Sequence, residues 1–126
     1  MITKQETFDT VVRHLGKQRE KSLLDMHCMD RGRNGTMCAA GCLIPDESYS
    51  EDFEGGMIRT TFSDEGDDKS SVLVSRLIES LDHDIRLVRA LQHTHDNSEV
   101  KEWPDVLLAV ACEYSLDGSI IAEAFA

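Results

Sequence analysis

Residues 3–15 read TKQETFDTVVRHL, and this stretch indicates how the chain is built. Thr3, followed three positions later by Glu6, has the form of a capping box, in which side chains satisfy the free backbone N–H groups at a helix start. Apolar residues then recur at positions 8, 11, 12 and 15, which places them on one face of an α-helix. We therefore expect an amphipathic helix over roughly residues 3–21, with Gly16 as its weak point.

The second half of the chain repeats this helical pattern. Apolar residues at positions 74, 77, 78 and 81 predict a helix that begins near residue 70, and Asp82 or Asp84 can cap the next one. Pro104 suits the first turn of a last main helix, because its missing N–H has no partner there. Trp103–Tyr114 carries a strong apolar stripe, and Gly118 is the expected C-terminal stop of that helix.

Residues 28–46, CMDRGRNGTMCAAGCLIPD, break this pattern. Asn-Gly is the commonest pair in tight hairpin turns, so Asn34-Gly35 predicts a short β-hairpin with arms at 28–31 and 36–38. The small residues 39–43 predict a closely packed helical turn. With 126 residues, the chain suits one domain. The expected fold is α+β and predominantly helical, a single small domain (1–126) with about four helices and a short β-hairpin.

The charge is acidic and unevenly distributed. There are 24 Asp and Glu residues against 13 Lys and Arg, a net charge of −11, and residues 46–68 hold nine acids against Arg59 alone. Such a surface repels DNA and anionic membranes, so we expect a basic protein partner, no direct nucleic acid and no membrane. Residues 46–71 read as an acidic, loop-rich segment, with a short strand over 57–62. No targeting segment or membrane span is recognised, which predicts a cytoplasmic protein with reduced thiols.

The cysteines allow three interpretations. His27, Cys28, Cys38 and Cys42 supply four soft donors for a zinc ion, and Cys38 and Cys42 have the spacing of one helical turn. Cys38 at the start of a turn also suits a nucleophile. Buried free cysteines, however, commonly pack as small hydrophobes. We expect this structural role, with Cys28 and Cys38 facing each other across the hairpin and Cys42 packed beneath them, all reduced and metal-free. Cys112, in the last main helix, is expected to pack in the interior in the same way.

Two His-Asp pairs, His83-Asp84 and His95-Asp96, are similar to those of metal-dependent phosphohydrolases. Helix capping explains Asp84 and Asp96 more simply. The acidic segment fails the calcium-loop pattern, because Glu51 occupies the position that requires glycine. We expect no catalytic residues and no cofactor. The alternative is a small zinc-binding or metal-dependent hydrolytic protein that uses the cysteine cluster and the His-Asp pairs.

The acidic segment is the preferred candidate for a binding surface. Carboxylates spread over a surface can imitate the spaced phosphates of nucleic acid, and the same electrostatics then give a high association rate. A solvated loop that keeps the protein soluble is the simpler interpretation. The expected partner-binding residues are Glu51, Asp52, Glu54, Asp64, Glu65, Asp67 and Asp68.

Cys28, Gly35, the block Cys38–Asp46 (CAAGCLIPD) and Tyr49 together resemble a known pattern. The chain is similar to small uncharacterised proteins of tailed bacteriophages and prophages that share a C-A-x-G-C-L-I-P-D core, although Met29 stands where an aromatic residue is expected. The resemblance implies a phage accessory protein, of a kind that binds and modulates or inhibits a host protein. The expected function is therefore non-enzymatic binding of a host macromolecule in the cytoplasm of the infected cell, as a nucleic-acid mimic or anti-defence factor.

Overall fold

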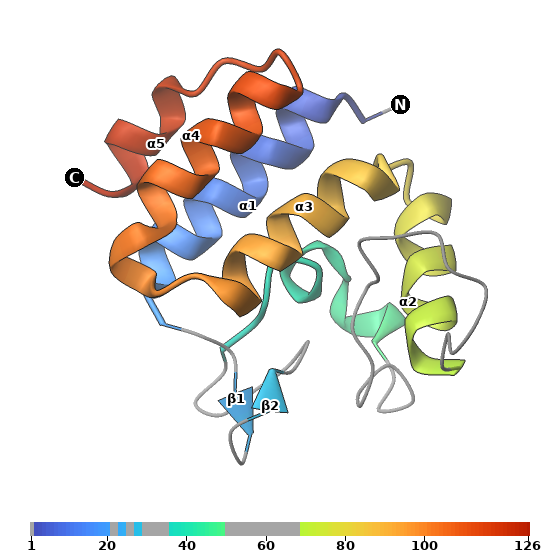
Figure 1. Ribbon diagram of the computed structural model, residues 1–126. Coiled ribbons are helices and arrows are strands. Elements are labelled where there is room, and N and C mark those ends of the chain that lie inside the picture. The colour runs from blue at the N-terminus through green and yellow to red at the C-terminus, as the bar shows by residue number, and fades with distance from the viewer. Residues whose placement is uncertain (1, 21–22, 25–26, 29–35, 50–68) are drawn as a thin grey trace.

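The structure is a computed structural model that describes residues 2–20, 23–24, 27–28, 36–49 and 69–126, with side chains described for 2–20, 36–49 and 75–126 (Figure 1). The described part is a single, mainly helical small domain, which confirms the prediction of one small, predominantly helical domain. Its α-helices are α1 (Lys4–Gln18), α2 (Lys69–Ser80), α3 (Ile85–Asn97), α4 (Trp103–Glu113) and α5 (Ser119–Ala124). Short 3₁₀ turns are η2 (Gly41–Leu43), η3 (Asp46–Ser48) and η5 (Val100–Glu102).

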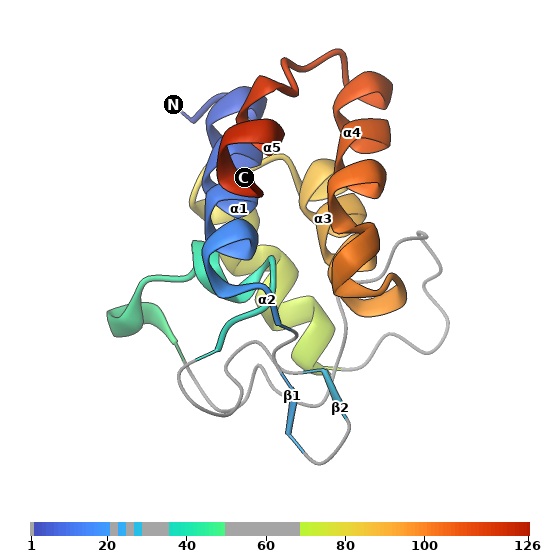
Figure 2. The ribbon, with the colours of Figure 1, turned by 90° about the vertical axis from the view of Figure 1, so that its left-hand side faces the viewer.

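The helices pack around one core. Helix α1 lies against both α3 and α5, and α3 lies against α4, while α2 contacts the start of α3 (Figures 1 and 2). Apolar residues on the facing sides of α1, α3 and α4 are fully buried, as their helical spacing predicts. The largest of them are Phe8, Leu15, Leu87, Leu91, Trp103 and Leu107.

Helix α1 begins as predicted and ends earlier. The Thr3 hydroxyl accepts the Glu6 N–H at 3.1 Å, and the Glu6 carboxylate accepts the Thr3 N–H at 3.4 Å, so the capping box is confirmed. The helix ends at Gln18, and the next residue, Arg19, caps it with a left-handed backbone (φ 50°). The Arg19 guanidinium donates to the carbonyls of Gly16, Ala124 and Ala126, so the turn that stops α1 also ties it to the last helix.

Gly16 is the point at which α5 approaches α1. A Cβ atom at Gly16 would lie 2.4 Å from the backbone oxygen of Ala124, far inside the distance that real Cβ contacts allow. The apparent weak point of α1 is therefore a packing position. The prediction for Gly118 is wrong: α4 ends at Glu113, and Gly118 precedes α5 as its N-cap.

The other helix starts agree with the sequence pattern. Asp84 caps α3, because its carboxylate accepts the Leu87 N–H at 3.0 Å. Pro104 lies in the first turn of α4, and the small residues at 39–43 form the turn that contains η2. These local signals predicted the helix starts correctly, because each of them depends only on neighbours within four residues.

The predicted β-hairpin is not shown. Residues 29–35, which include the Asn-Gly turn, lie outside the described residues. The described strands are β1 (Leu23–Leu24) and β2 (His27–Cys28), an antiparallel pair in which Leu23 pairs with Cys28. The expected strand at 57–62, most of the acidic segment and the predicted contact between Cys28 and Cys38 also fall outside the described part.

Candidate functional site

The turn at residues 38–42 packs two cysteines against the core, with Cys38 buried and Cys42 partly buried. Cys38 is buried, and its sulfur accepts the Gly41 N–H at 3.2 Å. The Cys42 thiol donates to the Ala39 carbonyl at 3.1 Å, and burial raises the pKa of this thiol to about 12. A high pKa disfavours the thiolate that zinc binding and nucleophilic catalysis both require. These contacts support the predicted structural role.

The candidate zinc ligands are not assembled by the described side chains. Only the backbones of His27 and Cys28 are described, in β2, while Cys38 and Cys42 belong to the buried turn. Among the residues whose placement is given, no group of three or more His, Cys, Asp and Glu side chains is arranged to hold a metal ion.

Replacing Cys38 with Ala should lower the free energy of unfolding by about 1–2 kcal/mol, because a buried sulfur and its contact with the Gly41 N–H are lost. Cys42→Ala should have a similar effect. Chemical denaturation of the purified variants measures the change, and native mass spectrometry of the wild type gives the metal content. Release of a bound metal by either substitution would contradict the structural role.

A chain of buried hydrogen bonds attaches this turn to α3. The Ala40 N–H donates to the Gln92 side-chain oxygen at 2.9 Å, and the Gln92 amide donates to Asp96 Oδ1 at 2.8 Å. His95 Nδ1 lies 2.7 Å from the same oxygen. His95 and Gln92 are buried, so these polar groups satisfy one another away from water. The second His-Asp pair therefore belongs to a polar network inside the core.

Trp103 completes this network from the side of α4. Its indole stacks on the His95 imidazole, with ring centroids 5.6 Å apart and an angle of 28° between the planes. Both rings are fully buried. In the part of the chain that the structure describes, the Trp103 Nε1–H has no hydrogen-bond partner. Trp103 therefore contributes through packing and stacking.

The first His-Asp pair has separate contacts. His83 Nδ1 lies 2.7 Å from the Thr7 hydroxyl, which joins the start of α3 to α1, and burial lowers the pKa of His83. Asp84 is the helix cap described above. The two pairs lie at opposite ends of α3, so the structure does not bring them together as one hydrolytic site.

A further contact joins α1 to the segment before the cysteine turn. His14 Nε2 and the Gln18 amide both donate to the Met37 carbonyl, at 2.8 and 3.0 Å. The Gln18 side-chain oxygen accepts the Met37 N–H at 2.8 Å, and burial lowers the pKa of His14. Sequence reasoning missed this role, because the partners are far apart in the chain.

The predicted acidic binding residues, from Glu51 to Asp68, all lie outside the described residues. Of the nine acidic residues in 46–68, the structure describes Asp46 and Glu47, which lie in the first turn of η3 and are exposed. The segment leads from η3 to α2 along the chain.

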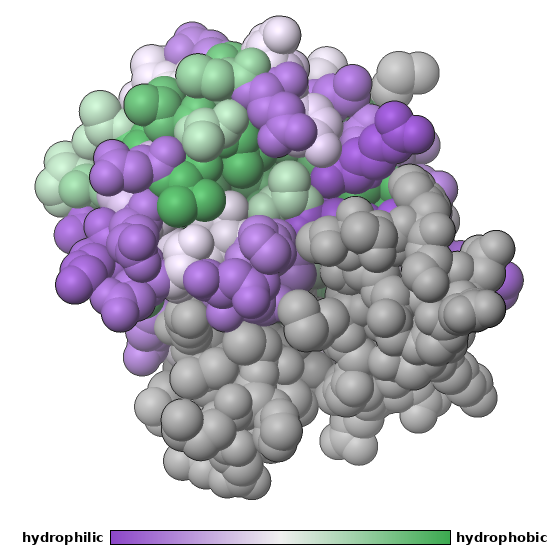
Figure 3. All heavy atoms as spheres, viewed as in Figure 1, coloured by the Kyte–Doolittle hydropathy of each residue, from purple (hydrophilic) through white to green (hydrophobic). Residues whose placement is uncertain are grey.

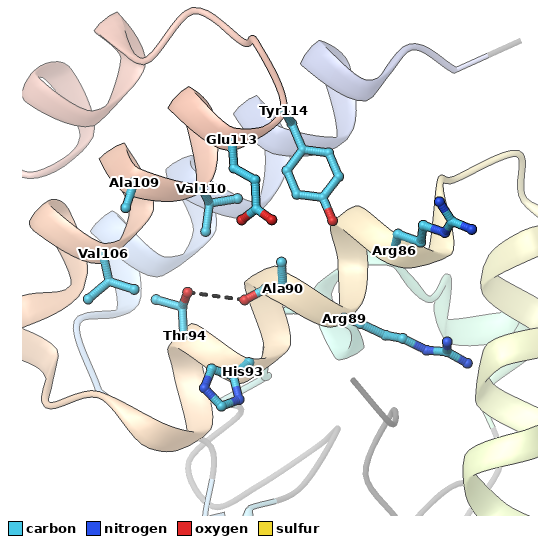
Figure 4. Close-up of a pocket in the computed structure, with 10 residues that line it drawn as sticks. All are labelled: Arg86, Arg89, Ala90, His93, Thr94, Val106, Ala109, Val110, Glu113 and Tyr114. Carbon is cyan, nitrogen blue, oxygen red and sulfur yellow. Dashed lines mark hydrogen bonds between the residues drawn. The ribbon is translucent and has the colours of Figure 1, made fainter. Parts of the chain in front are cut away.

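A groove between α3 and α4 was not predicted (Figure 4). Its volume is about 700 Å³. Helix α4 supplies an apolar side with Val106, Ala109 and Val110, and α3 adds Ala90 and Thr94. The α3 edge also carries basic side chains, and one end is lined by Glu113, the last residue of α4, and by Tyr114, which follows it. The basic residues are Arg86, Arg89 and His93.

The outer side of α4 is unusually apolar. Leu108 is 50% exposed, and Cys112 is also exposed, so the expectation that Cys112 packs inside the domain is wrong. Leu107 and Ala111, one residue earlier in each case, occupy the buried side of the helix. Hydrophobic surface gathers over this part of the molecule in Figure 3.

Comparisons with protein-family models, with curated proteins and with solved structures found no significant match. Within the described helices, none has the length and apolar character that crossing a membrane requires.

Proposed function

We propose that this protein is a non-enzymatic, phage-type accessory protein that binds a basic surface of a host macromolecule and modulates or inhibits it. The observation that carries the proposal is the concentration of nine carboxylates against one arginine in residues 46–68. Negative charge at this density attracts a basic surface before contact is made, and this attraction raises the rate at which the two proteins associate. A nucleic-acid mimic that blocks a defence complex is one form of this function.

Two observations on the described residues support binding over metal chemistry. Asp46 and Glu47, at the start of the acidic segment, are exposed to solvent, where a partner can reach them. Cys42, His95 and Asp96, which the alternative function needs as ligands or catalytic groups, are held in partly buried hydrogen bonds within the protein. Stoichiometric zinc in untagged protein, measured by native mass spectrometry, would favour the alternative.

Reversing three charges, Asp64→Lys, Asp67→Lys and Asp68→Lys together, should slow association with the partner by at least about tenfold at low salt. The net charge changes from −11 to −5, because three negative groups become positive. Quantitative capture from a bacterial lysate, followed by kinetic measurement with the recovered partner, tests this. Capture by the wild type should weaken as salt rises, and short duplex DNA should compete with it if the surface is a nucleic-acid mimic.

A matched control carries the same net charge with its reversals elsewhere. Glu79, Asp105 and Glu123 are exposed, and replacing these three with Lys also gives −5. This control should retain most of the partner, because its acidic segment is intact. Equal capture by the wild type and the folded Asp64, Asp67 and Asp68 variant would refute the proposal and leave the segment with a solubilising role.

A further inference from the structure

We propose that His14 is an acid-sensitive contact between α1 and the cysteine turn (residues 38–42). At neutral pH it holds Met37, and with it the start of the turn, on α1; as the pH falls, it lets this segment move away. The inference does not depend on the acidic interface, since His14 and Met37 lie outside residues 46–68. It predicts a local conformational change in the pH range in which histidines titrate.

Two side chains of α1 hold the backbone of Met37. His14 Nε2 and the Gln18 amide donate to its carbonyl, and the Gln18 side-chain oxygen accepts its N–H. Both backbone polar groups of Met37 are therefore satisfied by α1. A separate hydrogen bond, from the Ala40 N–H to Gln92, attaches the turn to α3. His14 thus contributes to the attachment on α1, and Gln92 to the attachment on α3.

The contact with Met37 determines which ring nitrogen of His14 takes up a proton. A carbonyl oxygen only accepts, so Nε2 carries the hydrogen, and Nδ1 is the unprotonated nitrogen of the neutral ring. Acid adds a proton at Nδ1 and gives the ring a positive charge. The Nε2–H can still donate to Met37 in this state. The attachment is therefore weakened by the charge of the ring and not by the loss of a donor.

The surroundings of His14 disfavour this charge. Burial is the largest effect, and it lowers the pKa of His14 even though the hydrogen bond to Met37 favours the charged ring. His95, from α3, and Lys17, from α1 itself, lower the pKa of His14 further, because their positive charges repel that of the protonated ring. The attached state therefore prefers a neutral His14.

Among the described residues, His14 has no carboxylate partner. The ion pairs that these residues form do not include it. Asp96, the carboxylate of the adjoining network, is engaged by His95 and Gln92 at 2.7 and 2.8 Å. Protonation of His14 therefore places a positive charge in a partly buried contact without a counter-charge, which is less favourable than the same charge in water.

The direction of the pH effect follows from the lowered pKa. The pKa of His14 is lower in the attached state than in a released, hydrated state, where it has its ordinary value of 6.5. Above that value the contact stabilises the attached state fully, and this stabilisation is lost as the pH falls through the lowered pKa. The segment should therefore stay on α1 at about pH 7.5 and open more often toward about pH 5.

Amide hydrogen exchange measured by NMR at about pH 7.5 and about pH 5 tests the inference. The protection factor corrects for the effect of pH on the intrinsic exchange rate, and for the Met37 N–H it should fall at least about threefold in acid. The amides of α4 are the internal reference for global unfolding, and their protection should change less. No loss of protection at Met37, or an equal loss in α4, would overturn the proposal.

Two histidine variants separate His14 from other titrating groups. His14→Gln keeps an amide donor for the Met37 carbonyl but does not titrate, so the protection of Met37 should no longer depend on pH. His83→Asn is the matched control, because burial also lowers the pKa of His83 but its Nδ1 contacts Thr7, nearer the start of α1. This control should keep the wild-type response at Met37. A response that persists in His14→Gln, or is lost in His83→Asn, would contradict the role of His14.

A titration of the wild type by NMR gives a result that does not need a variant to fold. The ring signals of His14 should yield a pKa below 6.5, and a value above 6.5 would overturn the proposal. These experiments use the protein without a partner and leave residues 46–68 unchanged. Their failure therefore refutes the acid-sensitive contact alone, while failure of the charge-reversal experiment refutes the acidic interface alone.

Discussion

Trp103→Ala should lower the free energy of unfolding by about 3–5 kcal/mol, the range for removing a large aromatic side chain from a core. Trp103 is fully buried in the core and stacks on His95, so the substitution removes apolar core packing and the ring that stacks on the imidazole. Urea denaturation followed by circular dichroism measures the change. Fluorescence is unsuitable, because Trp103 is the only tryptophan in the chain.

Trp103→Phe is the matched control. It keeps a stacked aromatic ring and removes an Nε1–H that makes no hydrogen bond among the described residues. The expected loss is under about 2 kcal/mol, since only part of the ring volume disappears. If Phe were as destabilising as Ala, the indole N–H would have an essential partner and the packing explanation would be wrong.

Gly16→Ala should destabilise the protein by about 1–3 kcal/mol, although alanine is normally the better helix former. The new Cβ would meet the Ala124 backbone oxygen, so α5 has to move away from α1. Hydrogen exchange should show faster exchange of amides in residues 119–124, while amides in α3 and α4 change less. Urea denaturation gives the total effect.

Gly118→Ala tests whether any added methyl group would do the same. There the Cβ would lie 3.0 Å from the end of the Leu108 side chain, which can rotate away, so the expected loss is under about 1 kcal/mol and comes from the N-cap position of Gly118. A stabilising Gly16→Ala variant, or equal losses for the two glycines, would contradict the proposed close packing of α1 and α5.

The helices that the sequence predicted have strong local signals. The capping box at Thr3, the Asp84 cap and Pro104 all act within one turn, and apolar periodicity marks the buried sides of α1 and α3. Helix α5 was missed because it has only six residues and begins at a glycine that also suits the end of α4. Short helices depend on packing, and the packing partner of α5 is α1.

The contacts of the candidate sites were harder to predict than the helices. Gln92 bonds to Ala40 and Gln18 bonds to Met37, across separations of 52 and 19 residues that no local pattern reveals. Cys112 was placed in the interior because α4 is apolar on nearly every side, and composition then does not tell which side faces the core. A helical period does relate the basic residues Arg86, Arg89 and His93, and this pattern could have predicted the basic edge of the groove between α3 and α4.

The contact between α1 and α5 also affects the order of folding. Arg19 and Ala124 are 105 residues apart in the chain, and closing a loop of this length costs about 4 kcal/mol of chain entropy. At bacterial and eukaryotic synthesis rates of about 5–20 residues per second, residues 119–124 follow α1 by roughly 5–20 seconds. The side of α1 at Gly16 therefore remains uncovered until α5 has been synthesised, and the packing of α5 is a late step in the formation of this domain.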